Sequence, residues 1–133
     1  ISTYPRGTSM HIDHINISAP KELLLKVRDF YCEVLGLTEG FRPNFSRGGF
    51  WLYSEGKPII HLIESTDHYR NEKQGFFDHF ALQATGLAKI CDNLDAAGIE
   101  YRVSYLPQID MSQIFCKDPS GTGVEINFLN ETV

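Results

Sequence analysis

The chain has 133 residues, of which 42% are hydrophobic and 12% aromatic, so it can close the core of one domain or of two small fused modules. No apolar run approaches the roughly 20 residues that a membrane-spanning helix needs, and we expect no membrane segment. The formal charge of −5, without a block of Lys and Arg, argues against a nucleic-acid partner.

The cysteines and the N-terminal residues bear on the cellular compartment. Cys32, Cys91 and Cys116 are odd in number and show neither CxxC nor disulfide-framework spacing, which favours a reducing, cytoplasmic location. Residues 1–9 have no apolar core of the kind found in a secretory signal. We expect them to be a tail or an appended remnant, with Met10 as a candidate natural start.

The first half of the chain predicts a strand, a helix and a short meander. Residues 11–18 alternate between polar and apolar side chains, with His14 in the polar row, which is typical of a strand. Apolar residues at helical spacing predict an amphipathic helix over residues 20–35, ended by Gly36. Further strands are expected at residues 50–53 and 58–64, with 38–45 as a less regular candidate.

The second half repeats this order after a polar connection. Residues 65–75 carry almost no apolar side chains and predict an exposed linker. A strand at 77–84 and a helix at about 87–97, ended by Gly98, follow. The remaining strands are expected at residues 100–104, 113–117 and 123–129. Each half is therefore βαβββ in an α+β fold, and we expect one domain over residues 10–133, with module one at about 10–64 and module two at about 76–130.

Two short stretches of the chain each recur about 65 positions later. In each case, side chains of a type that binds metals stand at equivalent positions of the two copies. Asp13-His14 returns as Asp78-His79, and His61 is answered at nearly the same interval by Glu125. If a pseudo-two-fold axis relates the two modules, the four ligand-type side chains can meet at that axis. Three imidazoles and a carboxylate suit a divalent transition metal. The predicted metal ligands are therefore His14, His61, His79 and Glu125.

Each of these residues also has an ordinary structural interpretation. A single His in a strand is usually a hydrogen-bonded structural or surface residue, and Glu125 alone could be a salt-bridge partner. However, a half-buried carboxylate among apolar strands is unfavourable unless it is paired or bound to a cation. His11 and His68 are expected to be bystanders.

Other side chains on neighbouring strands are candidates for contacting a substrate near the metal. The candidate substrate-binding residues, which could equally be ordinary core, are Trp51, Tyr53, Gln113 and Phe115. Four arginines are candidates for holding an anionic substrate, and their spacing selects none of them: Arg42, Arg47, Arg70 and Arg102.

Taken together, these motifs resemble the vicinal oxygen chelate superfamily, which includes glyoxalase I, extradiol dioxygenases, fosfomycin resistance proteins, methylmalonyl-CoA epimerase and bleomycin resistance protein. The resemblance extends from Met10 to Leu129. It is carried by Asp13-His14-Ile15, the helix end from Phe30 to Leu37, Ile60-His61-Leu62-Ile63-Glu64, Asp78-His79, and the stretch from Phe115 through Asp118-Pro119-Ser120-Gly121 to Glu125.

The resemblance implies paired βαβββ modules that form curved mixed sheets around a metal-centred cleft. It also implies a homodimer in which the first module of one chain faces the second module of the other, so that His14 and His61 would join His79 and Glu125 of the partner subunit. Each site would hold one divalent metal ion: Fe, Mn, Ni, Zn or Co. The position of His61 often holds Glu or Gln in the lyase and epimerase branches, and this difference leaves the branch open.

The chemistry favoured by this resemblance is a lyase or isomerase reaction on a small substrate that chelates the metal through vicinal oxygens. A Lewis acid acidifies the proton next to a bound carbonyl, and Glu125 is the leading candidate for the catalytic base. The resemblance to glyoxalase I implies that His61 would share this role. A ferrous extradiol-type dioxygenase is the first alternative, with His14, His79 and Glu125 as ligands. The other is a metal-free drug-sequestering protein of bleomycin-resistance type, which the negative charge suits and the four ligand-type residues do not.

Overall fold

The computed structural model describes residues 10–67 and 75–133. The expected tail at 1–9, and with it any test of Met10 as a start, lies outside the described residues, as do residues 68–74 of the expected linker. Neither described helix is long and apolar enough to cross a membrane.

The first module forms a four-stranded mixed sheet with one helical segment. Its elements are β1 (Ile15–Ala19), α1 (Lys21–Asp29), the π-helical turn η1 (Phe30–Val34), β2 (Thr38–Gly40), β3 (Gly49–Ser54) and β4 (Lys57–Glu64). The strand order is β1-β4-β3-β2, with β1 parallel to β4 and the other pairs antiparallel. The sequence prediction was wrong in three details. The first strand begins only at Ile15, so that His14 precedes it; the helix changes to a π-turn; and the strand expected at 38–45 keeps three residues.

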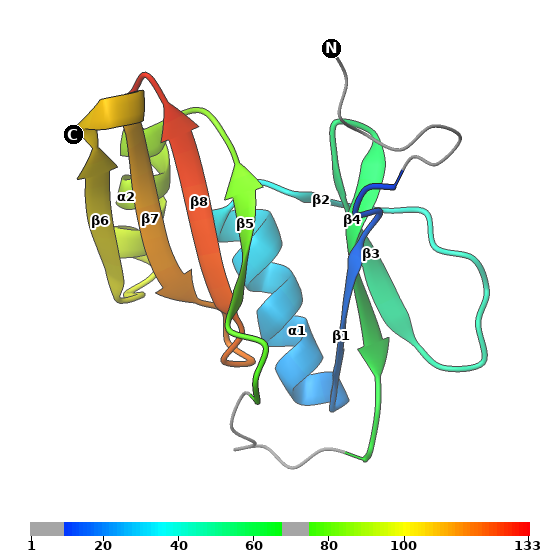
Figure 1. Ribbon diagram of the computed structural model, residues 1–133. Coiled ribbons are helices and arrows are strands. Elements are labelled where there is room, and N and C mark those ends of the chain that lie inside the picture. Colours follow the sequence, from blue (N-terminus) through cyan, green and yellow to red (C-terminus); the bar gives the residue numbers. More distant parts are fainter. Residues whose placement is uncertain (1–9, 68–74) are drawn as a thin grey trace.

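The second module repeats this architecture. Its elements are β5 (His79–Gln83), α2 (Leu87–Ala96), β6 (Tyr101–Leu106), the 3₁₀ turn η2 (Pro107–Ile109), β7 (Met111–Lys117) and β8 (Gly123–Leu129). The order β5-β8-β7-β6 matches that of the first sheet. The two sheets lie on either side of α1 (Figure 1). The predicted α+β fold of two βαβββ modules is therefore confirmed. The other predicted elements agree with the observed ones within two residues.

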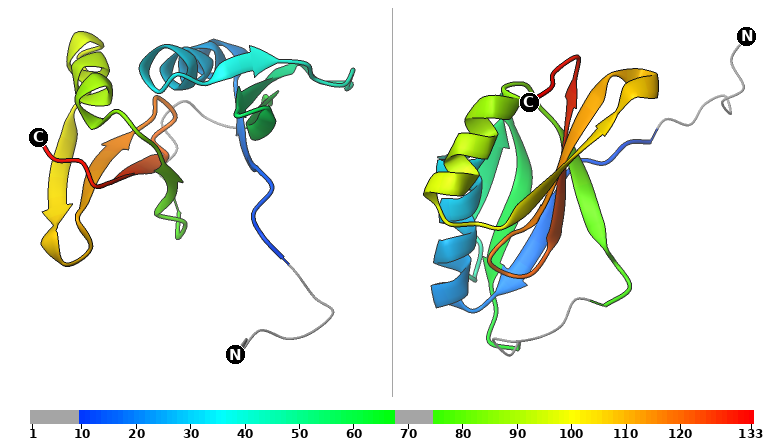
Figure 2. Two further views of the ribbon diagram at one scale, coloured as in Figure 1. Left: turned by 90° about the horizontal axis from the view of Figure 1, so that it is seen from above. Right: turned by 90° about the vertical axis from the view of Figure 1, so that its left-hand side faces the viewer.

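The core lies between the helices and one face of each sheet. Leu24 and Val27 of α1 are buried, and so are Leu52, Ile60 and Leu62 of the first sheet. The second sheet contributes the buried residues Ile114, Val124, Ile126 and Phe128, with Leu87 and Leu94 from α2. Both helices lie on the same side of the molecule, next to each other (Figure 2). Because neighbouring strand residues point to opposite faces, the residues between the buried ones face away from the helices.

Two polar contacts join the modules at the level of the helices. The hydroxyl of Tyr31 in η1 donates a buried hydrogen bond of 2.6 Å to Asp118, in the turn between β7 and β8. The side-chain amide of Asn93 in α2 donates to the carbonyl of Val34, at 3.0 Å. Burial, together with the charge of Asp118, raises the pKa of Tyr31 far above its usual value, so this hydroxyl remains a donor at any physiological pH.

Candidate metal centre

The strand registers place the repeated residues at equivalent positions of the two sheets. His61 in β4 is paired with Asn16 in β1, and Glu125 in β8 is paired with Ala81 in β5. His14 lies two residues before Asn16, and His79 lies two residues before Ala81. The sequence repeat is therefore also a repeat in space, on the faces that the helices leave uncovered.

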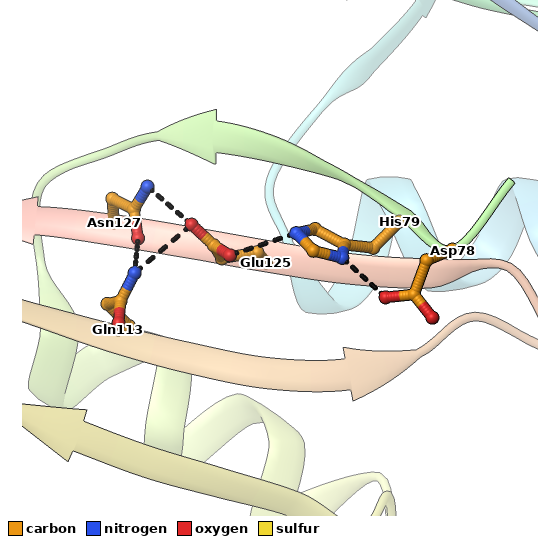
Figure 3. Close-up of polar contacts among 5 residues, drawn as sticks. All are labelled: Asp78, His79, Gln113, Glu125 and Asn127. Atoms are coloured by element: carbon orange, nitrogen blue, oxygen red, sulfur yellow. Dashed lines mark hydrogen bonds and ion pairs between the residues drawn. The ribbon is translucent and has the colours of Figure 1, made fainter.

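His79 and Glu125 form one close pair (Figure 3). The imidazole Nε2 of His79 lies 3.1 Å from a carboxylate oxygen of Glu125, whose side chain is only 13% exposed. The other oxygen accepts hydrogen bonds from the side-chain amides of Gln113, at 3.2 Å, and Asn127, at 2.8 Å. Two ligands bound about 2.0–2.2 Å from one metal ion lie about 3 Å apart. The spacing of His79 and Glu125 therefore fits a shared divalent cation.

An aspartate fixes the orientation of each of the histidines that follow it. The Nδ1 atoms of His14 and His79 lie 2.7 Å from carboxylate oxygens of Asp13 and Asp78, respectively. The hydrogen bond from His14 lowers the pKa of Asp13, and the hydrogen bond to Asp78 raises the pKa of His79, with a smaller contribution from Glu125. Holding Nδ1 in this way leaves Nε2 as the nitrogen that could bind a metal ion, an arrangement found in many metal-binding histidines.

Gly123 permits the close approach of the backbone that carries His79. A Cβ atom at Gly123 would lie 2.4 Å from the carbonyl oxygen of Asp78 and 2.8 Å from Cβ of His79. No side chain fits at this position, because such contacts are far below van der Waals distance. The glycine at the start of β8 is thus part of the geometry that sets His79 beside Glu125.

The first-module histidines adopt a different arrangement. The rings of His14 and His61 are stacked, with centroids 3.7 Å apart and planes 8° apart, and Trp51 stacks on His61 at 4.1 Å. Nε2 of His61 lies 3.0 Å from the carbonyl oxygen of Pro58, to which it can donate. Imidazole lone pairs lie in the ring plane, so two parallel stacked rings do not direct them to one point. In this conformation the rings of His14 and His61 do not direct their lone pairs to a common point.

The surroundings of His61 favour the neutral imidazole. Burial lowers the pKa of His61 most, and the neighbouring His14 adds to the effect. With Nε2 donating to Pro58, the Nδ1 lone pair is available to accept a proton.

Of the predicted substrate contacts on the first sheet, Trp51 lies in the site and Tyr53 does not. Trp51 and both first-module histidines line a hollow of about 190 Å³, whose other lining residues are Asn16, Arg42, Phe45, Leu62 and Ile63. The hydroxyl of Tyr53 donates instead to the carbonyl of Phe41 and so holds the segment between β2 and β3.

On the second sheet, Gln113 and Phe115 lie next to Glu125. Gln113 donates to its carboxylate, whereas Phe115 is directly opposite Glu125 in the β7–β8 register. The guanidinium of Arg102 covers the outer side of the Phe115 ring, at 4.3 Å. Gln113 is therefore placed to orient the carboxylate, and Phe115 forms an aromatic wall beside it.

The two pairs do not come together within a single chain. Among residues 10–67 and 75–133, no group of three or more His, Cys, Asp and Glu side chains could hold a metal ion. We call His14 and His61 the first half-site, and His79 and Glu125 the second half-site. His11 is exposed, whereas His68 and Arg70 lie outside the described residues.

Three of the contributing side chains, Asp13, Asp78 and Asn127, were not among the site residues predicted from the sequence. Asp13 and Asp78 were visible as part of the repeat, but the alternation of a strand placed Asp13 away from His14. Asn127 lies two residues after Glu125, and this spacing was a sufficient signal for a shared strand face. Arg42 was one of four arginine candidates, and the sequence could not single it out because its place beside the histidines depends on the path of the segment between β2 and β3.

Comparison with known proteins identifies the family. Residues 11–126 match the family model of the Glyoxalase/Bleomycin resistance protein/Dioxygenase superfamily. The chain belongs to this superfamily. Its resemblance to the vicinal oxygen chelate proteins is thereby confirmed.

Solved structures of glyoxalase-like proteins share the fold. A Bacillus anthracis protein assigned to the glyoxalase family is 24% identical, with a TM-score of 0.72 over 94% of this chain and 99% of that one. A glyoxylase/bleomycin resistance protein/dioxygenase domain from Frankia sp. is 16% identical, with a TM-score of 0.74 and coverages of 95% and 96%.

A third structure is that of a variant of the fosfomycin resistance protein FosX from Listeria monocytogenes, complexed with Mn(II) and 1S,2S-dihydroxypropylphosphonic acid. It is 16% identical, with a TM-score of 0.66 and coverages of 94% and 93%. No curated protein sequence gives a significant match.

Proposed function

We propose that this superfamily member is a metal-dependent enzyme that acts on a small substrate with vicinal oxygens by lyase or isomerase chemistry. The observation that carries the proposal is the second half-site, where His79 Nε2 and the carboxylate of Glu125 lie 3.1 Å apart. The donor types, imidazole and carboxylate, are those that transition metals and zinc prefer.

The ligand set that fits best is His14, His79 and Glu125. In each of the two histidines an aspartate engages Nδ1 and leaves Nε2 for the cation. A divalent cation bound there would act as a Lewis acid and acidify the proton next to a chelated carbonyl. Three protein ligands leave room for the two adjacent oxygens of a substrate.

His61 is the residue that we propose to move the proton. It is neutral, it stacks on His14, and its Nδ1 lone pair is not engaged by a described side chain. From the sequence, Glu125 was the leading candidate for this role, with His61 as a residue that could share it. Its carboxylate is held by the amides of Gln113 and Asn127, and this fixed position suits a ligand better than a base.

The enzyme would be a homodimer with cross-subunit sites. Each chain carries two half-sites that do not complete each other, and the helices leave the half-site faces of both sheets uncovered. A two-fold dimer would bring the first half-site of one chain to the second half-site of the other. The cysteines are free thiols, which supports a cytoplasmic location for this dimer.

The FosX complex supports the type of ligand. The molecule bound to that protein with Mn(II) carries two adjacent hydroxyl groups, according to its name. Such a compound offers two neighbouring oxygens, which is the feature we propose for the substrate of this chain.

The first test is metal analysis of protein purified without chelators. We expect one divalent ion per chain, lost in His79→Ala and Glu125→Gln and retained in His61→Ala. His11→Ala is the matched control, because His11 is exposed and lies outside both half-sites. Folded wild-type protein that takes up none of Fe, Mn, Ni, Zn or Co would contradict the proposal.

The reaction class needs a second measurement. Lyase or isomerase chemistry predicts metal-dependent exchange of solvent deuterium into a 2-hydroxy carbonyl compound, abolished in His61→Ala. The same two-histidine, one-carboxylate set also suits ferrous iron, so oxygen uptake with catechols tests the dioxygenase alternative. Oxygen consumption that requires ferrous iron, without deuterium exchange, would replace the lyase assignment.

A further inference from the structure

Arg42 lies beside the first half-site and has no acidic partner among residues 10–67 and 75–133. It lines the hollow together with His14, His61 and Trp51, and no acidic side chain of the described residues lines that hollow. One terminal nitrogen of its guanidinium donates to the carbonyl of Arg47, at 3.1 Å, and the group lies 4.8 Å from the ring centre of Phe45. It forms no ion pair with any described residue, and its Nε is fully buried without a hydrogen-bond partner.

The local structure holds this guanidinium in place. A Cβ atom at Gly49 would lie 3.1 Å from a terminal nitrogen of Arg42 and 2.0 Å from the carbonyl oxygen of Leu62. A side chain at this position would clash with the backbone of β4 and would crowd the guanidinium of Arg42. Tyr53 holds the same segment from the other side, through its hydrogen bond to the carbonyl of Phe41.

A half-buried, unpaired guanidinium is energetically unfavourable unless an anion reaches it. Its planar array of N–H groups matches the oxygens of a carboxylate or a phosphate. At about 30 Å³ per water molecule, a hollow of about 190 Å³ has room for a carboxylate or a phosphate group. The aromatic faces of Trp51 and Phe45 would exclude water around that group.

We propose that Arg42 binds the anionic group of the substrate, so that the substrate is a small oxyacid with vicinal oxygens next to its carboxylate or phosphate. The vicinal oxygens rest on the function proposed above, whereas the oxyanion rests on Arg42 itself. The positive charge also disfavours a cationic drug in this hollow, and so argues against the sequestering role.

Trp51 provides a direct test, because it is the single tryptophan of the chain and it lines the hollow. Its fluorescence is titrated with glycerate, glycerol 3-phosphate and glycerol, which share a pair of adjacent oxygens and differ in charge. The titrations are made on metal-free protein and repeated with zinc. We expect each anion, or one of the two, to bind at least about tenfold more tightly than glycerol. Tighter binding of glycerate would assign a carboxylate, and tighter binding of glycerol 3-phosphate a phosphate.

Two variants test whether the side chain of Arg42 itself binds the anion. Arg42→Gln should weaken binding of the preferred anion about tenfold or more and leave glycerol unchanged. Arg47→Gln is the control, because only its backbone carbonyl contacts Arg42 and its side chain lines a different hollow, beside Glu64. Equal binding of the three compounds by the wild type, or unchanged anion binding by folded Arg42→Gln, would overturn the inference. If Arg42→Gln does not fold, the comparison of the three compounds binding to the wild-type protein tests the inference by itself.

These outcomes are independent of the proposed metal site. Anion binding that depends on Arg42 in a protein without metal affinity would refute the enzyme and keep the oxyanion site. Metal binding without any preference for anions would support the metal site and refute the oxyanion site.

Discussion

At the scale of single residues, the Asp-His dipeptide is the smallest unit of the candidate site. Asp13 and Asp78 each engage Nδ1 of the following histidine, at the same distance of 2.7 Å. A carboxylate in this role fixes the tautomer of a ligating histidine and increases its basicity. The two modules thus repeat both the histidine that we propose as a ligand and the carboxylate that orients it.

Replacement of Asp78 by Asn is expected to weaken metal binding about 10–100-fold at pH 8. The hydrogen bond to Asp78 holds the pKa of His79 above its usual 6.5. A proton therefore competes with the metal for Nε2, and the affinity of the wild type should fall as the pH decreases through this raised pKa. In Asp78→Asn the fall should begin at lower pH. Competition with a chelating dye between about pH 5.5 and 8.5 measures both effects.

The raised pKa of His79 also makes the stability of the metal-free protein depend on pH. Because the folded-state pKa of His79 is raised, its hydrogen bond stabilises the fold fully below the unfolded-state pKa and ceases to do so as the pH rises through the folded-state value.

Asp92→Asn, on an exposed position of α2, is the control for the metal-affinity measurement on Asp78→Asn. An affinity profile of Asp78→Asn identical to that of the control would contradict the assigned role.

The cysteine thiols should be unreactive in the folded protein. Burial raises the pKa of Cys116 to about 11, and burial also raises the pKa values of Cys32 and Cys91. At pH 8 only about a thousandth of Cys116 would be thiolate, which is the reactive form. Labelling with iodoacetamide at this pH should be slow for all three and fast after denaturation. Rapid labelling of Cys116 in folded protein would show that its side chain is accessible.

At the scale of secondary-structure elements, period-two alternation predicted most of the strands. Ile60 and Leu62 are buried on either side of His61, and Val124 and Ile126 flank Glu125 in the same way. The helical stripe was also predicted correctly, since Leu24, Val27 and Val34 are buried. The change from α1 to a π-turn was not predictable, because the spacing of apolar residues is compatible with both kinds of helix.

The π-turn contributes to the stability of the fold through Tyr31. This side chain is fully buried, and its hydroxyl is the donor to one oxygen of the buried Asp118. We expect Tyr31→Phe to lower the free energy of unfolding by about 1.5–3 kcal/mol, the usual range for a hydrogen bond to a charged group. Urea denaturation monitored by circular dichroism measures this decrease in the free energy of unfolding.

Tyr105→Phe serves as the matched control for Tyr31→Phe. Tyr105 also donates to an aspartate, Asp110, but this pair is exposed. Water can replace its hydrogen bond, so we expect a smaller loss of stability. Equal losses in the two variants would contradict the structural importance assigned to the buried pair.

At the scale of the whole molecule, the arrangement of two incomplete half-sites predicts complementation between chains. His14→Ala and Glu125→Ala should each be defective in metal binding as homodimers. A heterodimer of the two variants would combine the intact His14 of one chain with the intact Glu125 of the other in one of its two sites. An equal mixture should therefore recover about a quarter of the wild-type metal content, given random exchange of subunits.

Complementation is measured by metal analysis after unfolding and refolding the mixture, with each variant refolded alone as the control. If the sites were formed within one chain, no heterodimer would contain a complete site and no metal would be recovered. Analytical ultracentrifugation of the same samples establishes whether the chain is dimeric.

The sequence by itself determined the duplicated α+β architecture, the faces of the strands and the repeat that relates His14 to His79 and His61 to Glu125. These features follow from local periodicity and from internal similarity, which a linear pattern records. Tertiary structure decided what the pattern does not record. It stacked His61 between His14 and Trp51, held Glu125 with two amides and brought Arg42 beside the first half-site. Such contacts depend on strand pairing and on the path of a loop, which residues distant in the chain fix only when the whole fold has formed.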